Sequence, residues 1–355
     1  MNDAFSNKRV LVVGGAGFVG SNLVRVLLET SPEVEVVVID NLLSSERENL
    51  PSDPRVELRV GSIADDAVLA GVDDSFDYVF HLACFHGNQS SIHDPLADHQ
   101  NNLLTTLKLF ERLKRDHPRL ERIVYAGAGC AAAKKTYGDP VATKEDAPLS
   151  LEQDSPYSIS KLVGEFYAVY FHKQHELPVV RARFQNVFGP GEVLGAGQWR
   201  GTPATVWRNV TPTFVYKALH GEVLPLHNEG DSSRDFIFVR DLCRGLIACA
   251  LRGQPGEAYN LASGKEHTIR QLAEHIVELT GSEAGFELLP RRTWDTSGRR
   301  YGCPEKSKQE LGFTAEVSLR EGLEQTVAWT RANLDRIEAC VAKHAEQLRA
   351  SQVVG

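Results

Sequence analysis

The stretch VLVVGGAGFVGSNLVRVLLET, at residues 10–30, decides the fold of this chain. A short apolar run ends in a glycine-rich turn, and a segment with the apolar spacing of a helix follows it. The turn carries Gly14, Gly17 and Gly20 in a G-x-x-G-x-x-G pattern. Glycines at these positions permit a tight turn and let backbone N–H groups approach a pyrophosphate at the start of the helix. The stretch therefore predicts a strand–turn–helix unit that binds a dinucleotide.

A carboxylate follows the second apolar run at the spacing that such a unit uses. VEVVVIDN, at residues 34–41, predicts a strand that ends at Asp40, which lies twenty residues past Gly20. A carboxylate at this place accepts hydrogen bonds from the ribose hydroxyls of adenosine and repels a 2′-phosphate. We therefore expect NAD rather than NADP as the cofactor.

Further short apolar runs alternate with segments of helical length. The predicted strands are 56–62, 76–83, 122–129 and 179–189. Strands that are joined by helices form parallel βαβ units, and fully apolar strands fit a sheet that is covered on both faces. The expected fold class is α/β, a Rossmann-type doubly wound parallel sheet with a smaller C-terminal domain.

The change of sequence style along the chain predicts the domain organisation. The dinucleotide-binding domain is expected at 1–186, with a return segment near 236–265, and the substrate domain at 187–235 and 266–335. Helices are expected at 156–178, at 268–281 and over 318–348, so that 336–355 forms a helical tail. Residues 190–209 are rich in Gly, Pro, Trp and Arg without clear periodicity, which predicts a long surface insertion with a role of its own.

Composition excludes several classes of protein. The 355 residues include 39 Lys and Arg against 47 Asp and Glu, a net charge of −8, which disfavours nucleic acid as a partner. No apolar run is long enough to span a membrane, and no separate hydrophobic signal core precedes the first strand. The six cysteines form no CxxC pair, and His172 and His175 have no third ligand nearby, so no metal site is expected. These features favour a cytoplasmic enzyme.

The segment Tyr157-Ser-Ile-Ser-Lys161 carries a candidate acid–base pair. Positions i and i+4 share one face of a helix, so the phenol and the ammonium can point into one cleft. A free tyrosine has a pKa of about 10, and a cation about 4 Å away favours its phenolate. We therefore expect Lys161 to lower the pKa of Tyr157 and to make it a usable acid–base.

Six motifs now stand in one order along the chain. They are GGAGFVG (14–20), Asp40-Asn41, VFHLA (79–83), Tyr157…Lys161, RFQNVFGP (183–190) and SSRDFIFVRD (232–241). Over roughly residues 8–330 the chain resembles the extended short-chain dehydrogenase/reductase family. Within that family it is similar to nucleotide-sugar 4-epimerases of the UDP-glucose/UDP-N-acetylglucosamine type.

The resemblance implies a set of binding residues. It implies Tyr157 as the acid–base, Lys161 as a ligand of the nicotinamide ribose, and a substrate diphosphate held by Asn186, Arg234 and Arg292. It implies a cofactor site that also includes Gly14, Gly17, Phe18, Val19, Gly20, Asp40, Asn41, Ser62, Ile63, Leu82, Ala83 and Asn102. It further implies a homodimer through a four-helix bundle, with 98–116 and 156–175 as the candidate helices.

One position departs from the family pattern. Relatives place Ser or Thr near the end of the strand at 122–129, where it hydrogen-bonds the reacting sugar hydroxyl, but this chain has Ala128. The hydroxyl can come instead from Ser90 or Ser91, water can replace it, Cys130 can take the role, or the reaction can differ. Cys130 also resembles the cysteine of family members that epimerise a carbon next to a keto group.

Three other features bear on the substrate. His86, beside the expected sugar pocket, is a candidate donor to a uronate or acetamido group if its pKa stays near neutral. The aromatic and basic residues of the insertion suit either stacking on a ligand or anchoring of the loop; they are Trp199, Arg200, Trp207 and Arg208. The acidic residues that dehydratases and decarboxylases of the family carry after the Ser/Thr position are replaced by Gly129-Cys130.

The sequence therefore predicts an NAD-dependent epimerase that inverts C4 of a UDP-hexose, UDP-N-acetylhexosamine or UDP-uronate through a 4-keto intermediate. A role in making precursors of surface polysaccharides is the expected context. The alternatives are a C5 or C3,C5 epimerase that uses Cys130, and a protein that binds UDP-sugar and NAD but has lost catalysis.

Overall fold

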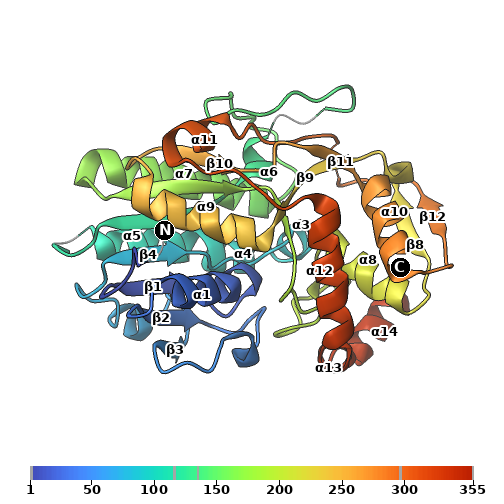
Figure 1. The fold of residues 1–355 in the computed structure, drawn as a ribbon, viewed down its shortest axis with the longest axis horizontal. Helices are drawn as coiled ribbons and strands as arrows, with labels where there is room; N and C mark the ends of the chain where they lie inside the picture. The colour runs from blue at the N-terminus through green and yellow to red at the C-terminus, as the bar shows by residue number, and fades with distance from the viewer. Residues whose placement is uncertain (1–2, 115–116, 134–135, 296–297, 354–355) are drawn as a thin grey trace.

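The protein is described from a computed structural model, which covers residues 3–114, 117–133, 136–295 and 298–353 (Figure 1). A seven-stranded sheet lies at its centre, and every strand pair in this sheet is parallel. Its order is β3-β2-β1-β4-β5-β6-β10, so the first six strands have the doubly wound order of dinucleotide-binding folds. The strands are β1 (Arg9–Val13), β2 (Glu35–Asp40), β3 (Val56–Val60), β4 (Tyr78–His81), β5 (Arg122–Ala128), β6 (Val179–Phe184) and β10 (Ala258–Leu261).

Helices cover both faces of this sheet, which explains why its inner strands are apolar on both sides. On one face α1 (Phe18–Thr30) and α9 (Val239–Arg252) share a core with β1, β4 and β6. On the other face α5 (Thr105–Leu113) and α7 (Pro156–His175) pack against β1, β4 and β5. The predicted α/β class and the parallel central sheet are confirmed.

A second layer of structure lies beside the carboxyl ends of the strands (Figure 1). One small sheet has the order β11-β9-β7 and another pairs β12 with β8, and both pack with three helices around a separate core. The elements are β7 (Asn186–Phe188), β8 (Leu224–His227), β9 (Ser233–Phe238), β11 (Glu266–Thr268), β12 (Phe286–Leu289), α8 (Val210–Leu219), α10 (Ile269–Thr280) and α12 (Leu319–Ala332). After β9 the chain returns to the central sheet, because α9 covers one face of that sheet and β10 is one of its strands.

Short elements complete the described chain. They are α2 (Asp66–Leu69), α3 (Asn88–His93), α4 (Pro95–Asp98), α6 (Gly129–Ala132), α11 (Glu305–Leu311), α13 (Leu334–Ala342), α14 (Ala345–Val353), a π-helix η2 (His99–Leu104), and the 3-10 turns η1 (Arg47–Asn49), η3 (Pro203–Thr205) and η4 (Asn228–Gly230). In the described residues no helix is both long enough and apolar enough to cross a membrane.

Several helices begin or end at residues that are typical of helix caps. Thr268 forms a capping box with Gln271 at the start of α10, and the helix ends at Gly281 in the left-handed conformation. Ser155 caps α7, whose first residue is Pro156. The helix predicted over 156–178 ends three residues early, because the left-handed Glu176 turns the chain into β6.

The second half of the chain bears out one prediction and contradicts another. The segment expected to be helical over 318–348 is helical, and it is divided into three helices, because Asn333 leaves the helical conformation and the chain turns again between α13 and α14. The insertion at 190–209 is not a surface loop. Its residues Val193, Leu194, Ala196 and Val206 are buried in a small core with α13 and α14. Their partners lie about 140 residues away, so no local pattern shows the contact.

Candidate active site

A cavity of about 660 Å³ opens where the strands of the central sheet end. The last residues of four strands line it: Val13 of β1, Asp40 of β2, Ala128 of β5 and Phe184 of β6. The second domain supplies the opposite wall, including Pro225 of β8 and Phe236 of β9. A ligand crevice at the carboxyl ends of parallel strands is the expected place in a doubly wound fold.

The glycine-rich turn leaves backbone exposed to this cavity. Gly14 has φ +84°, and a Cβ on it would lie 2.5 Å from the backbone nitrogen of Ala83. A Cβ on Gly20 would lie 2.3 Å from the carbonyl oxygen of Gly14. Helix α1 then begins at Phe18 with no side-chain cap and no acidic residue in its first turn. Its free N–H groups and its positive dipole end fit a pyrophosphate.

The carboxylate of Asp40 is fixed at the edge of the same turn. Oδ2 accepts from the backbone nitrogen of Ala16 at 2.9 Å, and Oδ1 accepts from the nitrogen of Leu42 and the hydroxyl of Ser45, each at 2.9 Å. These contacts hold the carboxylate in the cavity wall, where it is 8% exposed and retains acceptor capacity for ribose hydroxyls.

Most of the cofactor residues named from the sequence lie around this end of the cavity. The wall includes Phe18, Val19, Asn41, Ser62, Ile63, Leu82 and Ala83. Asn102 does not reach the wall. It is 3% exposed, and its Oδ1 accepts from the backbone nitrogen of Phe85 at 2.7 Å. Asn102 therefore positions the loop that follows β4. The described wall fits a dinucleotide.

Tyr157 and Lys161 enter the cavity from the first turns of α7. The ammonium of Lys161 donates to the carbonyl oxygen of Ala126 at 3.1 Å and lies 5.9 Å from the centre of the Tyr157 ring. Burial raises the pKa of Tyr157 well above 10, and Cys84 and Cys130 add to this rise. The expected lowering of this pKa by Lys161 does not outweigh burial, which is the largest cause of the rise.

Two cysteines flank the tyrosine. Cys130 and Cys84 both line the cavity, and all six cysteines are free thiols. Sequence reasoning singled out Cys130 but missed Cys84, although Cys84 follows the strand motif VFHLA by one residue. The segment of residues 122–133 contributes no carboxylate to the site.

The two serine candidates do not reach the cavity. Ser90 and Ser91 are both 0% exposed and lie behind the wall. The hydroxyl of Ser91 donates to the carbonyl oxygen of Asn88 at 2.8 Å and accepts from the backbone nitrogen of Tyr157 at 3.2 Å. Ser91 thus positions the start of α7. The hydroxyl that relatives place at Ala128 is not replaced by either serine in this arrangement.

His86 lies against the acid–base candidate in the cavity wall, with its ring centre 5.7 Å from that of Tyr157 in an edge-to-face arrangement. Burial, together with the cations Arg200, Arg208 and Lys161, lowers the pKa of His86 to about 3. The prediction of a near-neutral pKa is therefore wrong. His86 is a neutral imidazole at physiological pH, able to donate from one nitrogen and accept at the other.

Cations gather at the far end of the cavity. Asn186, Arg234 and Arg292 line it as expected, and Arg291 and Arg300 join them. Arg234 is fixed by donation to the carbonyl oxygens of Ser233 at 2.7 Å and Gly298 at 2.8 Å. Burial and the charge of Arg300 lower the pKa of Arg234 to about 9. Paired guanidinium groups suit a diphosphate, since each offers a fork of donors.

The insertion also contributes to the wall. Glu192, Trp207 and Arg208 line the cavity, whereas Trp199 packs against His344 and Arg200 donates to the carbonyl oxygen of His86 at 3.0 Å. Glu192 had no sequence signal, because it follows the FGPG turn as a lone acid. Among the described residues no group of three or more His, Cys, Asp or Glu side chains is arranged to hold a metal ion.

Known proteins share this fold and site region. The sequence model of the NAD dependent epimerase/dehydratase family matches residues 10–262. The enzyme WbmF of Bordetella bronchiseptica, crystallised with NAD+, is 57% identical with a TM-score of 0.87, over 98% of this chain and 99% of that one. WbmF has also been crystallised with NADH, and with NAD+ and UDP together.

More distant relatives catalyse more than one reaction. A UDP-N-acetylglucosamine 4-epimerase from Methanobrevibacter ruminantium M1, in complex with UDP-N-acetylmuramic acid, is 29% identical with a TM-score of 0.81, over 94% of this chain and 100% of that one. A dTDP-glucose 4,6-dehydratase of Actinoplanes sp. is 31% identical over 341 residues, which cover 92% of this chain and 98% of the relative. Because the family model spans most of the chain and similar solved structures hold NAD, this protein is an NAD-dependent enzyme of the epimerase/dehydratase family, the extended short-chain dehydrogenases/reductases.

Proposed function

We propose that this enzyme inverts C4 of a UDP-sugar through a 4-keto intermediate. The observation that carries the proposal is the shared cavity. Tyr157 and Lys161 face the same space as the pyrophosphate cradle at one end and the cations around Arg234 at the other. A sugar whose diphosphate lies on these cations extends toward the phenol.

The residues of the chain then have distinct tasks. The Oη atom of Tyr157 accepts the proton of the C4 hydroxyl and later returns it to the oxygen on C4, once the configuration of that carbon is inverted. When bound, NAD+ supplies the acceptor for the C4 hydride and gives the hydride back. Arg234 and Asn186 hold the diphosphate while the 4-keto sugar turns in the cavity, since guanidinium and amide donors suit phosphate oxygens.

The raised pKa of Tyr157 sets a condition on this chemistry. A phenol whose pKa lies above 10 is a poor base at neutral pH, so the pKa must fall before the proton moves. The ammonium of Lys161 lies 5.9 Å from the centre of the ring and favours the phenolate, and the positive charge of NAD+ would act in the same direction when bound. The proposal therefore makes Tyr157 active in the loaded enzyme.

The site favours epimerisation over dehydration. Loss of water across C5–C6 of a 4-keto sugar needs an acid and a base next to the reacting carbons. The end of β5 and the start of α6 offer Ala128, Gly129 and Cys130 there, and the chain has no carboxylate between 122 and 133. This absence supports the 4-epimerase and argues against a dehydratase or a decarboxylase.

Cys130 keeps a second candidate in view. A thiolate in the cavity wall can remove the acidic proton at C5 of a 4-keto sugar, which would make the enzyme a C5 or C3,C5 epimerase. The two reactions share the first oxidation at C4. Incubation in deuterium oxide separates them, because only the second reaction places solvent deuterium on C5.

The direct test is a product analysis against UDP-glucose, UDP-N-acetylglucosamine and UDP-glucuronate, each followed by NMR. We expect inversion at C4 of at least one of these sugars, with no deuterium at C5. A 4-keto-6-deoxy product would contradict the proposal. Retained UDP binding without any turnover would favour a binding protein that has lost catalysis.

We also propose that the enzyme is a cytoplasmic homodimer whose product serves surface-polysaccharide synthesis. Three apolar side chains on the outer face of α7 are more than half exposed: Ile159, Phe166 and Tyr170. Val163 and Tyr167 complete a shallow groove there. Of the candidate helices 98–116 and 156–175, the first has residues 115–116 outside the described part, and its Phe110 is fully buried in the core. A Phe166→Glu variant is expected to shift the mass in solution from dimer to monomer in light scattering.

A further inference from the structure

The insertion at residues 190–209, which we call the strap, crosses the dinucleotide end of the cavity. At one end it touches α1: the side-chain amide of Asn22 donates to the carbonyl oxygen of Pro190 at 3.1 Å. Near its middle it touches the loop after Asp40, where the nitrogen of Gln198 donates to the carbonyl oxygen of Leu43 at 2.9 Å. The strap therefore spans from the pyrophosphate cradle to the ribose loop.

The strap is rich in buried polar atoms that lack a partner. Of ten such side-chain atoms in the described residues, half belong to the strap: Glu192 Oε2, Arg200 Nε and Nη2, Thr202 Oγ1 and Arg208 Nε. Buried polar groups are nearly always hydrogen-bonded in native proteins. Two of these residues, Glu192 and Arg208, also line the cavity, and Glu192 is only 6% exposed. The cavity side of the strap is therefore built for a polar ligand.

The guanidinium of Arg208 is held in one orientation. Nη1 donates to the carbonyl oxygen of Ser44 at 3.0 Å, and Nη2 donates to the carbonyl oxygen of Ala196 at 2.8 Å. Only the Nε donor lacks a hydrogen-bond partner. Among the described residues no carboxylate forms an ion pair with Arg208 within 4.0 Å. Glu192, the nearby carboxylate, is instead hydrogen-bonded by the side-chain amide of Asn209.

The position of Arg208 identifies the ligand group. Its partner Ser44 belongs to the loop that follows Asp40, the ribose-binding carboxylate. On its other side it acts electrostatically on His86, which faces Tyr157. A dinucleotide that joins these two ends places its pyrophosphate between them. The substrate cations form a different group, because Arg234 is fixed to Ser233 and Gly298.

We propose that Arg208 binds the pyrophosphate of NAD from the side opposite the first turn of α1. The strap thus closes the cradle that the glycine-rich turn opens. The turn between α13 and α14 holds it there. The Nε2 atom of His344 hydrogen-bonds the carbonyl oxygen of Gly195 at 2.9 Å, and Lys343 forms an ion pair at 2.5 Å with Glu46, in the loop after Asp40. Val193, Leu194 and Val206 of the strap also share a small core with Ile337 of α13 and Leu348 of α14.

The test compares Arg208→Gln with Arg320→Gln, which removes the same charge from the exposed face of α12, where Arg320 pairs with Glu278. NADH binding is measured by fluorescence titration, and retained nucleotide is measured after denaturation of the purified protein. Loss of a charged hydrogen bond predicts roughly tenfold to hundredfold weaker NADH binding for Arg208→Gln. Arg320→Gln should bind NADH like the parent, and Arg208→Lys should lie between the two.

Binding of ADP-ribose and of adenosine shows whether Arg208 contacts the pyrophosphate or only supports the fold of the strap. ADP-ribose contains the pyrophosphate, whereas adenosine does not. Arg208→Gln is expected to weaken ADP-ribose binding tenfold or more and to leave adenosine and UDP binding unchanged. Equal loss for ADP-ribose and adenosine would show that Arg208 only supports the fold of the strap. A loss confined to UDP would assign the cation to the substrate, and unchanged NADH binding would also overturn the proposal.

Discussion

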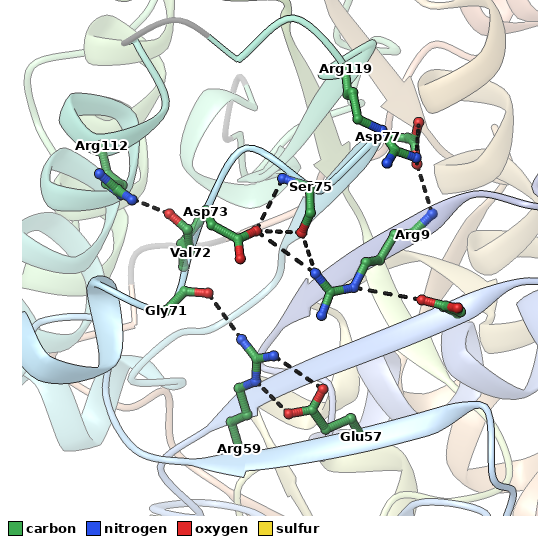
Figure 2. A network of polar contacts seen from close by, with 11 residues as sticks. Arg9, Glu57, Arg59, Gly71, Val72, Asp73, Ser75, Asp77, Arg112 and Arg119 are labelled. Carbon is green, nitrogen blue, oxygen red and sulfur yellow. Dashed lines mark hydrogen bonds and ion pairs between the residues drawn. The ribbon is translucent and has the colours of Figure 1, made fainter.

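The two edges of the central sheet differ in how their polar groups are satisfied. At the amino-terminal edge, a closed network joins Arg9, Asp73, Ser75 and Asp77 to neighbouring loops (Figure 2). At the carboxyl-terminal edge, the strap brings Glu192 and Arg208 to the cavity wall, and each has a buried polar atom without a partner. Charges are thus paired within the protein at one edge, whereas the segment over the other edge presents charges to the cavity.

This difference separates the polar groups that stabilise the fold from those that are available to bind ligands. A polar group that is fully paired within the fold contributes to stability, whereas an unpartnered buried group costs free energy until a ligand arrives. We therefore expect substitutions at the carboxyl edge to change binding and rate. Substitutions at the amino edge should change the free energy of unfolding and leave the rate intact.

The largest expected effect is at Tyr157. Tyr157→Phe removes the phenolic oxygen and keeps the ring, so we expect turnover to fall by about 10²–10⁴ while NADH binding stays within roughly twofold. Tyr170→Phe, on the exposed face of α7, is the matched control and should retain turnover. Steady-state kinetics with the active UDP-sugar measures both. Normal turnover by Tyr157→Phe would remove the tyrosine from the acid–base role.

A smaller effect is expected at the amino edge, at Asp77. This carboxylate is 4% exposed, accepts from the backbone nitrogen of Arg9 at 2.8 Å and pairs with Arg119 at 3.1 Å. Asp77→Asn should lower the free energy of unfolding by about 1–3 kcal/mol, because charged hydrogen bonds are weakened in a buried place. Urea unfolding measures this change.

The control for Asp77 comes from the same network. Glu57 pairs with Arg59 at 2.7 Å, but its side chain is 54% exposed. Glu57→Gln should therefore change the free energy of unfolding by less than about 1 kcal/mol. Turnover should be unaffected in both variants. If Asp77→Asn lost activity while its stability held, the division of labour between the two edges would be wrong.

The parts that were predicted from sequence are those that local pattern encodes. The glycine spacing, Asp40 and the alternation of strands and helices predicted a doubly wound parallel sheet, since such a fold is built from βαβ units. The helix predicted at 268–281 agrees with α10 and its two capping residues for the same reason. Most of the residues proposed for the cofactor and the diphosphate lie in one cavity, although their roles stay predictions.

The parts that were missed depend on contacts between distant segments. The strap is buried because α13 and α14 pack against it. The sequence of 190–209 has no periodicity that indicates contact with these two helices. Cys84 and Arg300 enter the cavity from loops whose neighbours are set by the tertiary fold. The pKa errors at Tyr157 and His86 have a common cause, since burial cannot be read from the residues beside a side chain.

The last prediction concerns acid stability, and it arises from a cavity residue. The pKa of His86 is lowered to about 3 by burial and by the cations around it, whereas an unfolded histidine titrates near about 6.5. Between these two values the unfolded chain binds a proton that the folded chain does not. His86 therefore makes the folded state lose stability as the pH falls from about 6.5 toward 3.

His86→Gln should remove this contribution. The plot of unfolding free energy against pH, measured by urea unfolding between pH 7 and 5, should become shallower by up to about 1.4 kcal/mol per pH unit. His220 has the opposite sign, because the carbonyl oxygen of Tyr216 and the carboxylate of Glu338 raise its pKa. His220→Gln should therefore steepen the loss of stability in acid. Equal slopes for His86→Gln and the parent would mean that burial and the cavity cations do not lower the pKa of His86 in the folded state, and the carboxyl edge would then be less buried or less positively charged than we infer.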